Sequence, residues 1–453
     1  MTNEEYLDTP LSYGTLEVSH FIPKDATTKF LEISEEKPPI ENIEEELIER
    51  INHPKNAPSL KEWIAKNYQK GEPVVILVDD NTRPNLHTRI LLPYLVPKVL
   101  EYGVTEEDLK IVIASGTHRP PTDQEIENQI LGTAIWNKYK EHVVTHNCDE
   151  GVEQIGTSSR NTPIFLNKLA LKAALIIGLS DSEYHYFAGV AGTVKQLFPG
   201  ISGRETIARN HPKMFDKELG FKPACRLGNT EANPVIQDMI EMAKEVKQRI
   251  PIFCIDAIIH NNQIVELHAG DIITLHQLAR ETLKPLRVLE VQEEADLVII
   301  TTGALGLNLY QAGKAIHAAW NAAKKGGKIL LLARAQDGVG NEAYHKTMQA
   351  VKDMGLDEAL VWVIENKCNE ETFRIGNQKP VDLLRILKDS QIDMITEMDP
   401  TELKETFRIN PVKIEGSIQE TLRAYVQKFL EEKPGGLIYV MNDAGLAVQI
   451  KGN

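Results

Sequence analysis

Short, continuous apolar runs that alternate with amphipathic stretches restrict the fold of this chain more than any other feature. Residues 73–78 read PVVILV, Leu109–Ala114 reads LKIVIA, and residues 171–179 contain a third such run. Strands that are apolar along their whole length are typical of parallel sheets that helices cover on both faces. Residues 86–102, between the first two runs, have helical periodicity. The first half of the chain therefore predicts an α/β fold with a mainly parallel sheet.

A second unit of the same kind begins near residue 280. Its strands are predicted at Ala295–Thr301 and residues 328–333, and its helices at residues 311–325 and 419–431. Near the end of the chain, the apolar runs LIYVM and LAVQI flank the turn sequence NDAG (442–445), which predicts a hairpin.

The length of 453 residues exceeds that of most single cores, so two domains are expected. We predict an N-terminal α/β domain of residues 1–280 and a C-terminal α/β domain of residues 281–433. The last strands, in residues 434–453, could belong to the C-terminal domain or return to the N-terminal one. Both domains should have mainly parallel sheets flanked by helices, with the active site in the cleft between them.

Composition predicts a cytoplasmic protein that does not bind nucleic acid. No run approaches the roughly 18 apolar residues of a membrane span, and the start, MTNEEYLDTP, lacks the features of a secretory signal. The net charge of −15 disfavours contact with nucleic-acid phosphates. Four widely spaced cysteines make a disulfide framework or a structural zinc site unlikely. They are Cys148, Cys225, Cys254 and Cys368.

Polar clusters follow the predicted strands at the points where the strands end. These clusters are DDNTRP (79–84), SGTHRP (115–120) and SDSEYHYFAG (180–189). Because the carboxyl ends of parallel strands share one edge of a sheet, the three clusters should lie close together. His118 also precedes a helix that a capping box at residues 122–125 should start, so free backbone N–H groups are expected near it.

Seven residues in and around these clusters are candidates for chemistry. Each alone has an ordinary structural explanation, since a histidine after a strand is usually a hydrogen-bonded loop residue and a lysine in a glycine-rich turn is usually solvated. Their occurrence together, at successive strand ends and on a helix that follows Gly306, indicates a functional site. The seven are Arg83, His118, His185, Lys195, His211, Gln311 and Lys314.

Four motifs resemble those of the nickel-dependent lactate racemase family, whose members use a nickel-pincer nucleotide. HYFAGVAGTVKQLFPGISGRETIARNHP (185–212) is similar to the central signature of that family. DDNTRP (79–84), SGTHRP (115–120) and NLYQAGKA (308–315) resemble its other motifs and follow the family's order. The match covers roughly residues 70–330, and four linked motifs are much more specific than any one of them.

The resemblance assigns a role to each candidate. Lys195 would join covalently to the cofactor, a pyridinium-3,5-bisthiocarboxylic acid mononucleotide, which Gly189 and Gly192 would help to bind in the N-terminal domain. His211 would be the protein ligand of the nickel. His118 and His185 match the two catalytic histidines. The residues expected to bind the substrate, or to orient groups that do, are Asp80, Arg83, Gln311 and Lys314.

The chemistry of a hydroxy acid is consistent with these roles. The hydrogen on the hydroxyl-bearing carbon is too weakly acidic for a histidine, so the resemblance implies reversible hydride transfer to the cofactor. Inversion then needs two bases, one for the hydroxyl proton of each enantiomer, and histidine titrates near neutral pH. Imidazole with sulfur donors suits nickel, and the carboxylate suits the guanidinium of Arg83 and the ammonium of Lys314.

Two departures from the lactate-specific pattern bear on the substrate. Gly192-Thr193-Val194 stands before the attachment lysine, where a second glycine and a basic residue are expected. Residues 374–387, which correspond to the region of the family's active-site tryptophan, contain no tryptophan. A different small 2-hydroxy acid is therefore expected, such as malate, a larger aliphatic or aromatic hydroxy acid, or a sugar acid such as gluconate.

Other classes of function are less well supported. The sequence Gly303-Ala304-Leu305-Gly306 after a strand would suit an NAD-type dehydrogenase of hydroxy acids, but it lacks the full G-x-G-x-x-G fingerprint. A non-enzymatic nickel- or nucleotide-binding protein would not need two candidate bases. We therefore expect an isomerase that depends on cofactor-synthesis and nickel-insertion proteins and acts as a monomer or homodimer.

Overall fold

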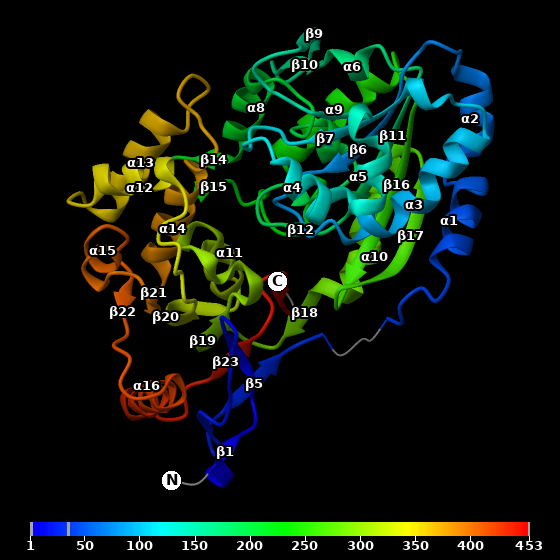
Figure 1. The fold of residues 1–453 in the computed structure, drawn as a ribbon. Helices are drawn as coiled ribbons and strands as arrows, with labels where there is room; N and C mark the ends of the chain where they lie inside the picture. The colour runs from blue at the N-terminus through cyan, green and yellow to red at the C-terminus, as the bar shows by residue number, and fades with distance from the viewer. Residues whose placement is uncertain (1–2, 34–36, 452–453) are drawn as a thin grey trace. The chain divides into compact units, whose positions relative to one another are not determined.

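The chain divides into two compact units in the computed structural model, which describes residues 3–33 and 37–451. One unit consists of Glu35–Met214 and Ala224–Leu286, and it is called the cofactor unit here because it contains Lys195, the residue predicted to carry the cofactor. The other, here called the C-terminal unit, consists of Met1–Ser34, Phe215–Pro223 and Arg287–Asn453. Figure 1 shows the helices and strands of both. No helix in the part of the chain that the structure describes is long and apolar enough to cross a bilayer.

The cofactor unit is built on a six-stranded sheet with the order β17-β16-β11-β6-β7-β8. All neighbouring strands are parallel except the β16–β17 pair, which is antiparallel. In chain order, the strands are β6 (Val74–Asp79), β7 (Leu109–Ala114), β8 (Val143–Thr145), β11 (Leu175–Asp181), β16 (Ile252–His260) and β17 (Gln263–Gly270).

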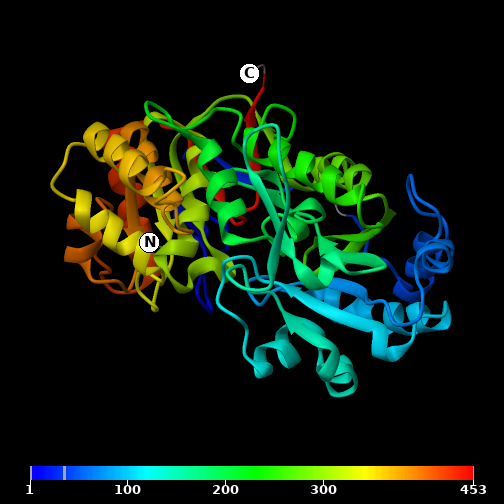
Figure 2. The ribbon, with the colours of Figure 1, turned by 90° about the horizontal axis from the view of Figure 1, so that it is seen from above.

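Both faces of the central strands are covered, which explains their continuous apolar sequence. Val74, Ile76 and Val78 belong to a core with α1, α2, α3 and α5, while Val75 and Leu77 point to the opposite face and are also fully buried. Helices α1 and α3 lie side by side (Figure 2). The longer helices of this unit are α1 (Ile43–Asn52), α2 (Leu60–Asn67), α3 (Leu86–Glu101), α5 (Thr133–Tyr139), α9 (Pro234–Lys247) and α10 (Ile272–Arg287).

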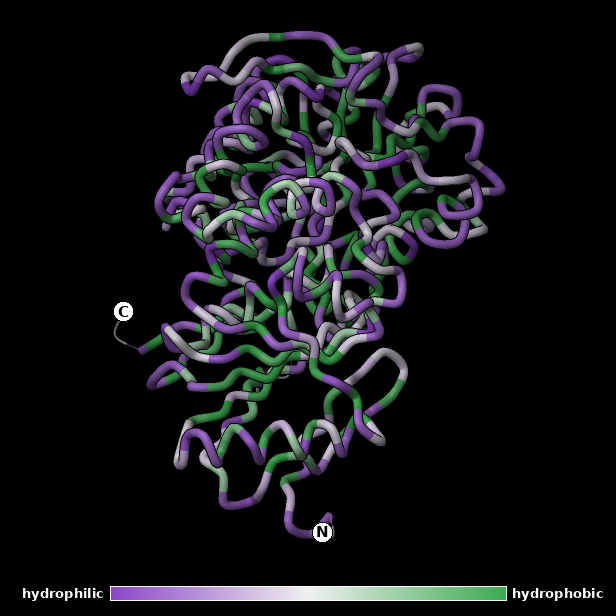
Figure 3. The backbone as a smooth tube through the Cα atoms, turned by 90° about the vertical axis from the view of Figure 1, so that its left-hand side faces the viewer, coloured by the Kyte–Doolittle hydropathy of each residue, from purple (hydrophilic) through white to green (hydrophobic). Residues whose placement is uncertain are grey.

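The C-terminal unit contains a second six-stranded sheet, whose described strand pairs are all parallel. Its order is β22-β21-β20-β19-β23-β5. The strands are β5 (Thr28–Leu31), β19 (Ala295–Thr301), β20 (Ala323–Leu332), β21 (Gln391–Ile395), β22 (Asn410–Pro411) and β23 (Ile438–Met441). Its helices include α11 (Leu309–Trp320), α12 (Glu342–Val351), α13 (Leu356–Lys367), α14 (Gln378–Asp389) and α16 (Ile418–Glu432). Figure 3 colours the backbone by hydropathy and shows hydrophobic, green stretches among hydrophilic, purple ones.

The predicted fold class is confirmed, with mainly parallel sheets flanked by helices in both units. The strands predicted at Leu109–Ala114 and Ala295–Thr301 have those bounds. Thr122 and Glu125 form the predicted capping box, but the helix that it starts, α4 (Asp123–Glu125), gives way at once to a π-helix at Ile126–Leu131.

The predicted hairpin near the C-terminus is wrong. β23 pairs with β19 and β5, and β24 (Ala447–Ile450) pairs with β18 (Val288–Val291), in parallel in each case. All four residues of β23 are buried. A run that is apolar on both faces is typical of a central parallel strand, whereas a hairpin strand with one solvated face alternates.

The two units differ from the predicted domains in the assignment of the chain ends. The prediction placed residues 1–280 in one domain and left residues 434–453 open, whereas β5 and β23 are adjacent strands of the C-terminal unit. The chain passes from the cofactor unit to the C-terminal unit at Leu286–Arg287. β5 is a short, half-exposed strand at the edge of a sheet, and its partner lies more than 400 residues away, so local periodicity does not indicate the pairing.

Candidate active site

The carboxyl ends of β6, β7 and β11 place the three polar clusters at one edge of the cofactor unit's sheet. β6 lies between β7 and β11 and is parallel to both. Asp79 ends β6 and Asp181 ends β11, while His118 follows β7. The three clusters therefore lie at the same edge of the sheet, as predicted.

Asp80 and His118 form a hydrogen-bonded pair, with 2.7 Å between His118 Nδ1 and Asp80 Oδ2. Burial tends to raise the pKa of Asp80, but the bond to His118, the Thr82 hydroxyl and the charge of Arg83 outweigh it, so the pKa is lowered. An ionised Asp80 accepts a hydrogen bond from the N–H at Nδ1 and so leaves Nε2 of His118 as the basic nitrogen. The His118 side chain is 44% exposed, so this nitrogen is accessible. Asp80 was expected to bind the substrate or to orient groups that do. In the structure its side chain is bonded to His118.

Arg83 lies among carboxylates at the same sheet edge. Its guanidinium is 3.9 Å from Glu183. Burial alone would lower the pKa of Arg83, but the charges of Glu183, Asp79 and Asp181 raise it further than burial lowers it. These acids therefore favour the charged form of the guanidinium.

A largely buried pair of aspartates near Arg83, Asp79 and Asp181, was not predicted. Burial and the neighbouring Asp181 raise the pKa of Asp79 well above its usual range, which favours the protonated form of the Asp79 carboxyl. The imidazole of His87, which is fully buried, lies 3.6 Å from Asp79 and 3.9 Å from Asp181. Burial also lowers the pKa of His87, which favours its neutral form.

The ring of Phe187 brings three of the predicted site residues together. His185 lies in the short antiparallel pair β12 (Tyr184–His185) and β13 (Gly189–Val190), and its ring is 4.5 Å from that of Phe187. The ring of His211 is 5.5 Å from Phe187, and Nζ of Lys195 lies 5.6 Å from the same ring centre. The backbone N–H of Ala188 donates to Nδ1 of His185, which places the hydrogen of a neutral His185 ring on Nε2.

His211 is held as a neutral imidazole. It is 3% exposed and begins a short 3₁₀-helix, His211–Met214, directly after α8 (Arg204–Asn210). Burial and the positive charge of Lys195 lower the pKa of His211 to about 3, despite a contact with the Ile207 backbone. A neutral imidazole close to a lysine amine is the form of histidine that can bind a metal ion.

Gly189 and Gly192 have backbone conformations that the protein's own packing requires. Gly189 has φ 84°, and a Cβ there would lie 2.2 Å from the carbonyl oxygen of Asn229. Gly192 has φ 77°, and a Cβ there would lie 2.4 Å from the Ser182 hydroxyl. Their identity is thus explained without a ligand, and cofactor binding by them stays a prediction.

Thr193, one of the departures from the family pattern, anchors the turn before Lys195. Its backbone has φ 37° and ψ −104°, which is unusual for a residue with a side chain. Its N–H donates to the Ser180 hydroxyl, which in turn donates to the buried Asp256. Its own hydroxyl is 2.9 Å from Nδ1 of His276. These bonds fix the start of α7 (Val194–Leu197), on which Lys195 lies.

The last two predicted residues, Gln311 and Lys314, lie on α11 in the C-terminal unit. The Asn308 side chain caps this helix by accepting from the backbone N–H of Gln311. The Gly303–Leu307 segment forms a 3₁₀-helix between β19 and α11. Both residues are half-buried on the first turns of the helix.

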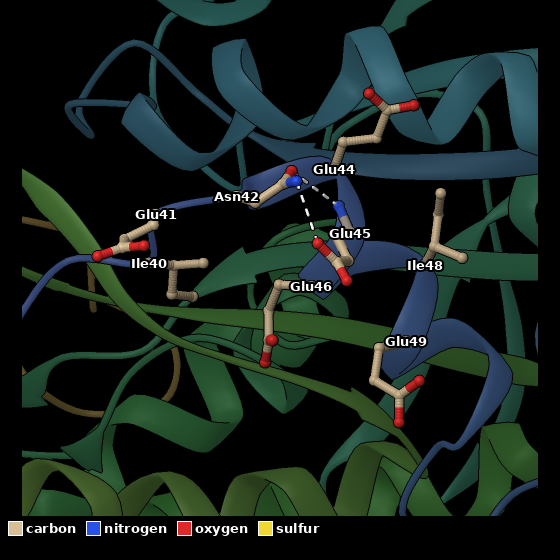
Figure 4. A pocket seen from close by; sticks show the side chains of 8 residues that line it. All are labelled: Ile40, Glu41, Asn42, Glu44, Glu45, Glu46, Ile48 and Glu49. Carbon is tan, nitrogen blue, oxygen red and sulfur yellow. Dashed lines mark hydrogen bonds between the residues drawn. The ribbon is translucent and has the colours of Figure 1, made fainter.

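A hollow along α1 contains none of the predicted site residues (Figure 4). It is lined mainly by glutamates, and Figure 4 shows the hydrogen bonds between Asn42 and Glu45, two of its lining residues. Asn42 is the N-cap of α1, and Glu44, Glu45 and Glu46 occupy the first turn. Carboxylates at this end of a helix complement its dipole, which accounts for their presence here.

Comparisons with known proteins agree with this arrangement. A model described as the lactate racemase N-terminal domain matches residues 13–220, and one described as the lactate racemase C-terminal domain matches residues 291–444. The lactate racemase of Lactiplantibacillus plantarum is 31% identical over 325 residues, which cover 70% of this chain and 73% of that protein. The chain belongs to the lactate racemase family. The predicted family is thereby confirmed, and with it the prediction of an isomerase family.

Further members and structures extend the match along the chain. The lactate racemase of Thermoanaerobacterium thermosaccharolyticum is 30% identical over 345 residues, which cover 75% of this chain and 77% of that protein. The structure of the lactate racemase apoprotein from the same species has a TM-score of 0.82 and 25% identity, covering 98% of this chain and 100% of that chain. A crystal structure of a Thermotoga maritima protein, with a TM-score of 0.60 and 14% identity, shares the fold alone.

Proposed function

We propose that this member of the lactate racemase family is a racemase or epimerase that inverts the hydroxyl-bearing carbon of a small 2-hydroxy acid. The observation that carries the proposal is the packing of His185, Lys195 and His211 around Phe187. The Asp80–His118 pair, at the carboxyl ends of the strands of the same unit, supplies a second histidine base.

The residues around Phe187 fit the family's cofactor, a nickel-bearing pyridinium mononucleotide. Lys195 would hold the organic part covalently, and the neutral imidazole of His211 would bind the nickel. Cofactor-synthesis and nickel-insertion proteins would be required as partners. When bound, this group supplies a reversible acceptor for the carbon-bound hydrogen of the substrate. The protein side chains are then left with proton transfer, orientation and binding.

His118 and His185 would each serve one enantiomer. In the Asp80–His118 pair, Nε2 of His118 can take the hydroxyl proton while the carboxylate stabilises the resulting imidazolium. His185 would do the same for the other enantiomer; because its Nδ1 accepts from the Ala188 N–H, the hydrogen of the neutral ring lies on Nε2, and uptake of a proton by His185 requires that bond to break. Arg83, Gln311 and Lys314 would bind the carboxylate and the neighbouring polar groups.

The proposal is tested with nickel-loaded protein and 2-hydroxy acids that carry deuterium on the hydroxyl-bearing carbon. Enantiomers should interconvert without soluble NAD, and the product should retain the deuterium. Retention is expected because no side-chain base removes that hydrogen as a proton. A hydrogen removed as a proton would exchange with water. Interconversion with complete washout of the deuterium, or no reaction of any 2-hydroxy acid with verified holoenzyme, would contradict the proposed function.

His211→Ala should lower nickel occupancy while the organic adduct on Lys195 remains. The imidazole would be the only protein donor to the nickel, whereas the covalent bond to the lysine does not involve it. Metal analysis of purified protein, combined with intact mass, separates the two effects. The control is His53→Ala, which removes a 74% exposed histidine at the end of α1 and should leave both quantities unchanged. Full nickel retention in His211→Ala would mean that another residue is the ligand.

A further inference from the structure

Helix α9 of the cofactor unit has an aspartate on the face that it buries. Asp238 shares this face with Val235 and Met242, and its side chain is 0% exposed. A carboxylate at such a position is costly unless donors satisfy its oxygens. An apolar side chain of similar size would avoid this cost, so the reason for an aspartate lies in the groups that it binds.

Side chains from two other segments of the cofactor unit donate to Asp238. Its Oδ1 accepts from the Ser158 hydroxyl at 2.6 Å. Its Oδ2 accepts from the Thr162 hydroxyl at 2.7 Å and from Nδ2 of Asn210 at 2.9 Å. Ser158 and Thr162 belong to one turn, whereas Asn210 is the last residue of α8. One buried carboxylate therefore joins three segments that are far apart in the chain.

Asn210 directly precedes His211, the proposed nickel ligand. Its Nδ2 donates to the carbonyl oxygen of Val235 at 3.0 Å as well as to Asp238, so this one amide bonds α9 twice. On the other side of His211, Nζ of Lys213 lies 4.0 Å from Oδ2 of Asp238. Residues on both sides of His211 are thus directed at the same carboxylate.

The position of the His211 ring depends on where the end of α8 lies. The ring contacts the backbone of Ile207, one turn earlier on the same helix. A backbone contact of this kind fixes the orientation of a metal-binding imidazole, but here it does so only relative to α8. The bonds of Asn210 to α9 fix the end of α8 itself, and any movement of that end would carry His211 with it.

Helix α9 also holds Phe187, whose ring lies 5.5 Å from that of His211. Asn233 is the N-cap of α9, and its Oδ1 accepts from the backbone N–H of Val235 at 3.1 Å. The Nδ2 of the same side chain donates to the Phe187 carbonyl oxygen at 2.7 Å. One helix therefore braces both the Phe187 backbone and the turn that bears His211.

We infer that Asp238 is a positioning residue of the nickel site, which acts through Asn210 to fix the turn that presents His211. The inference rests on the proposed function, in which His211 binds the nickel, and it adds a residue that does not contact the metal. Outer residues that orient a metal ligand typically change metal affinity by about 10- to 100-fold when they are replaced.

The test measures the rate at which holoenzyme loses nickel to an excess of EDTA. Asp238→Ala removes the shared acceptor, and it should speed nickel loss at least about 10-fold while the adduct on Lys195 remains. Asn210→Ala should act in the same direction. It breaks the bonds beside His211 and leaves Asp238 bonded to Ser158 and Thr162, so it tests the inference even if Asp238→Ala does not fold.

A conservative variant distinguishes positioning from a general loss of charge. In Asp238→Asn, the amide oxygen can take the place of Oδ2 and accept from Thr162 and Asn210, while the Ser158 hydroxyl can accept from the amide N–H. Nickel loss should therefore stay within about 3-fold of the wild-type rate, well below the effect expected of a lost outer residue.

The apoprotein supplies a measurement that does not depend on nickel. Backbone amides of residues 210–214 should exchange with deuterium at least about 10-fold faster in Asp238→Ala than in the wild type, because the turn has lost its anchor. The control is Asp108→Ala. Asp108 also accepts from several donors, but it directly precedes β7, at the opposite end of that strand from His118. It should change neither nickel loss nor exchange at 210–214.

His211→Ala separates failure of this inference from failure of the proposed function. If His211→Ala retains its nickel, the proposed ligand is wrong and the inference falls with it. If His211→Ala loses nickel but Asp238→Ala and Asn210→Ala, both folded, release it at the wild-type rate, the positioning role alone is disproved. Equally fast release from Asp108→Ala, or unchanged exchange at 210–214 in Asp238→Ala, would also overturn the inference.

Discussion

Lys195→Ala should abolish both the covalent adduct and the racemase activity of the protein. The proposed attachment needs a primary amine at this position, and alanine offers none. The backbone of α7 should keep its place, because the bonds that anchor it come from Thr193, Ser180 and His276. Intact mass of protein made together with the cofactor-synthesis partners should show the adduct in the wild type and its absence in the variant.

Two further variants make this result specific. Lys172→Ala removes an exposed lysine of the same unit, and it should retain the adduct and the activity. Lys195→Arg keeps a positive charge near Phe187 but cannot form the same bond, so it should also lack the adduct. An adduct that persists in Lys195→Ala, or that maps by peptide mass to another lysine, would refute the assignment.

The position of the active site could be predicted because it depends on local patterns. Apolar runs at β6, β7 and β11 indicated parallel strands, and polar side chains directly after such strands must lie at the same sheet edge. The order of the strands in the sheet was not needed for this step. The hydrogen bond between Asp80 and His118 follows from this placement together with the direct pairing of β6 with β7.

The residues that were missed depend on contacts that no local pattern reveals. Asp79 and Asp181 each end a strand in an ordinary-looking acidic turn, and only the pairing of β6 with β11 makes them a buried pair. His87 lies in a helix whose sequence gives no sign that this position faces them. Phe187 could have been recognised in part, because it lies between His185 and Gly189 in the motif, but its role at the centre of three site residues is a matter of packing.

Lys379, on α14, is another residue whose position no local pattern reveals, since it is only 4% exposed. The sequence of residues 374–387 is distinctive only in its lack of a tryptophan. A lysine in a polar helix of this kind would ordinarily be solvated. The structure places its side chain against Gly313, more than sixty residues earlier in the chain. A glycine in the middle of a helix such as α11 has a cost in stability, and room for a buried lysine is a reason to accept it.

His118→Ala and His185→Ala should each reduce racemisation in both directions by about 10²- to 10⁴-fold, the usual contribution of a positioned acid or base. Each conversion removes the hydroxyl proton with one histidine and returns it with the other, so loss of either interrupts both directions. Neither histidine is the proposed attachment residue or the proposed nickel ligand. Intact mass and nickel content should therefore match the wild type, which distinguishes a catalytic defect from failure to assemble the cofactor.

Asp80→Asn separates the role of His118 as a base from that of its partner. Asparagine keeps the size of the side chain but removes the charge that stabilises the protonated ring and fixes the proton on Nδ1. Activity should fall less than in His118→Ala, and the pH at which activity rises should move downwards because the imidazolium loses its counter-ion. An Asp80→Asn protein with an unchanged pH profile would show that the carboxylate has no influence on the base. A His118→Ala protein with near-normal rates in both directions would remove the pair from the reaction and leave His185 to act with another group.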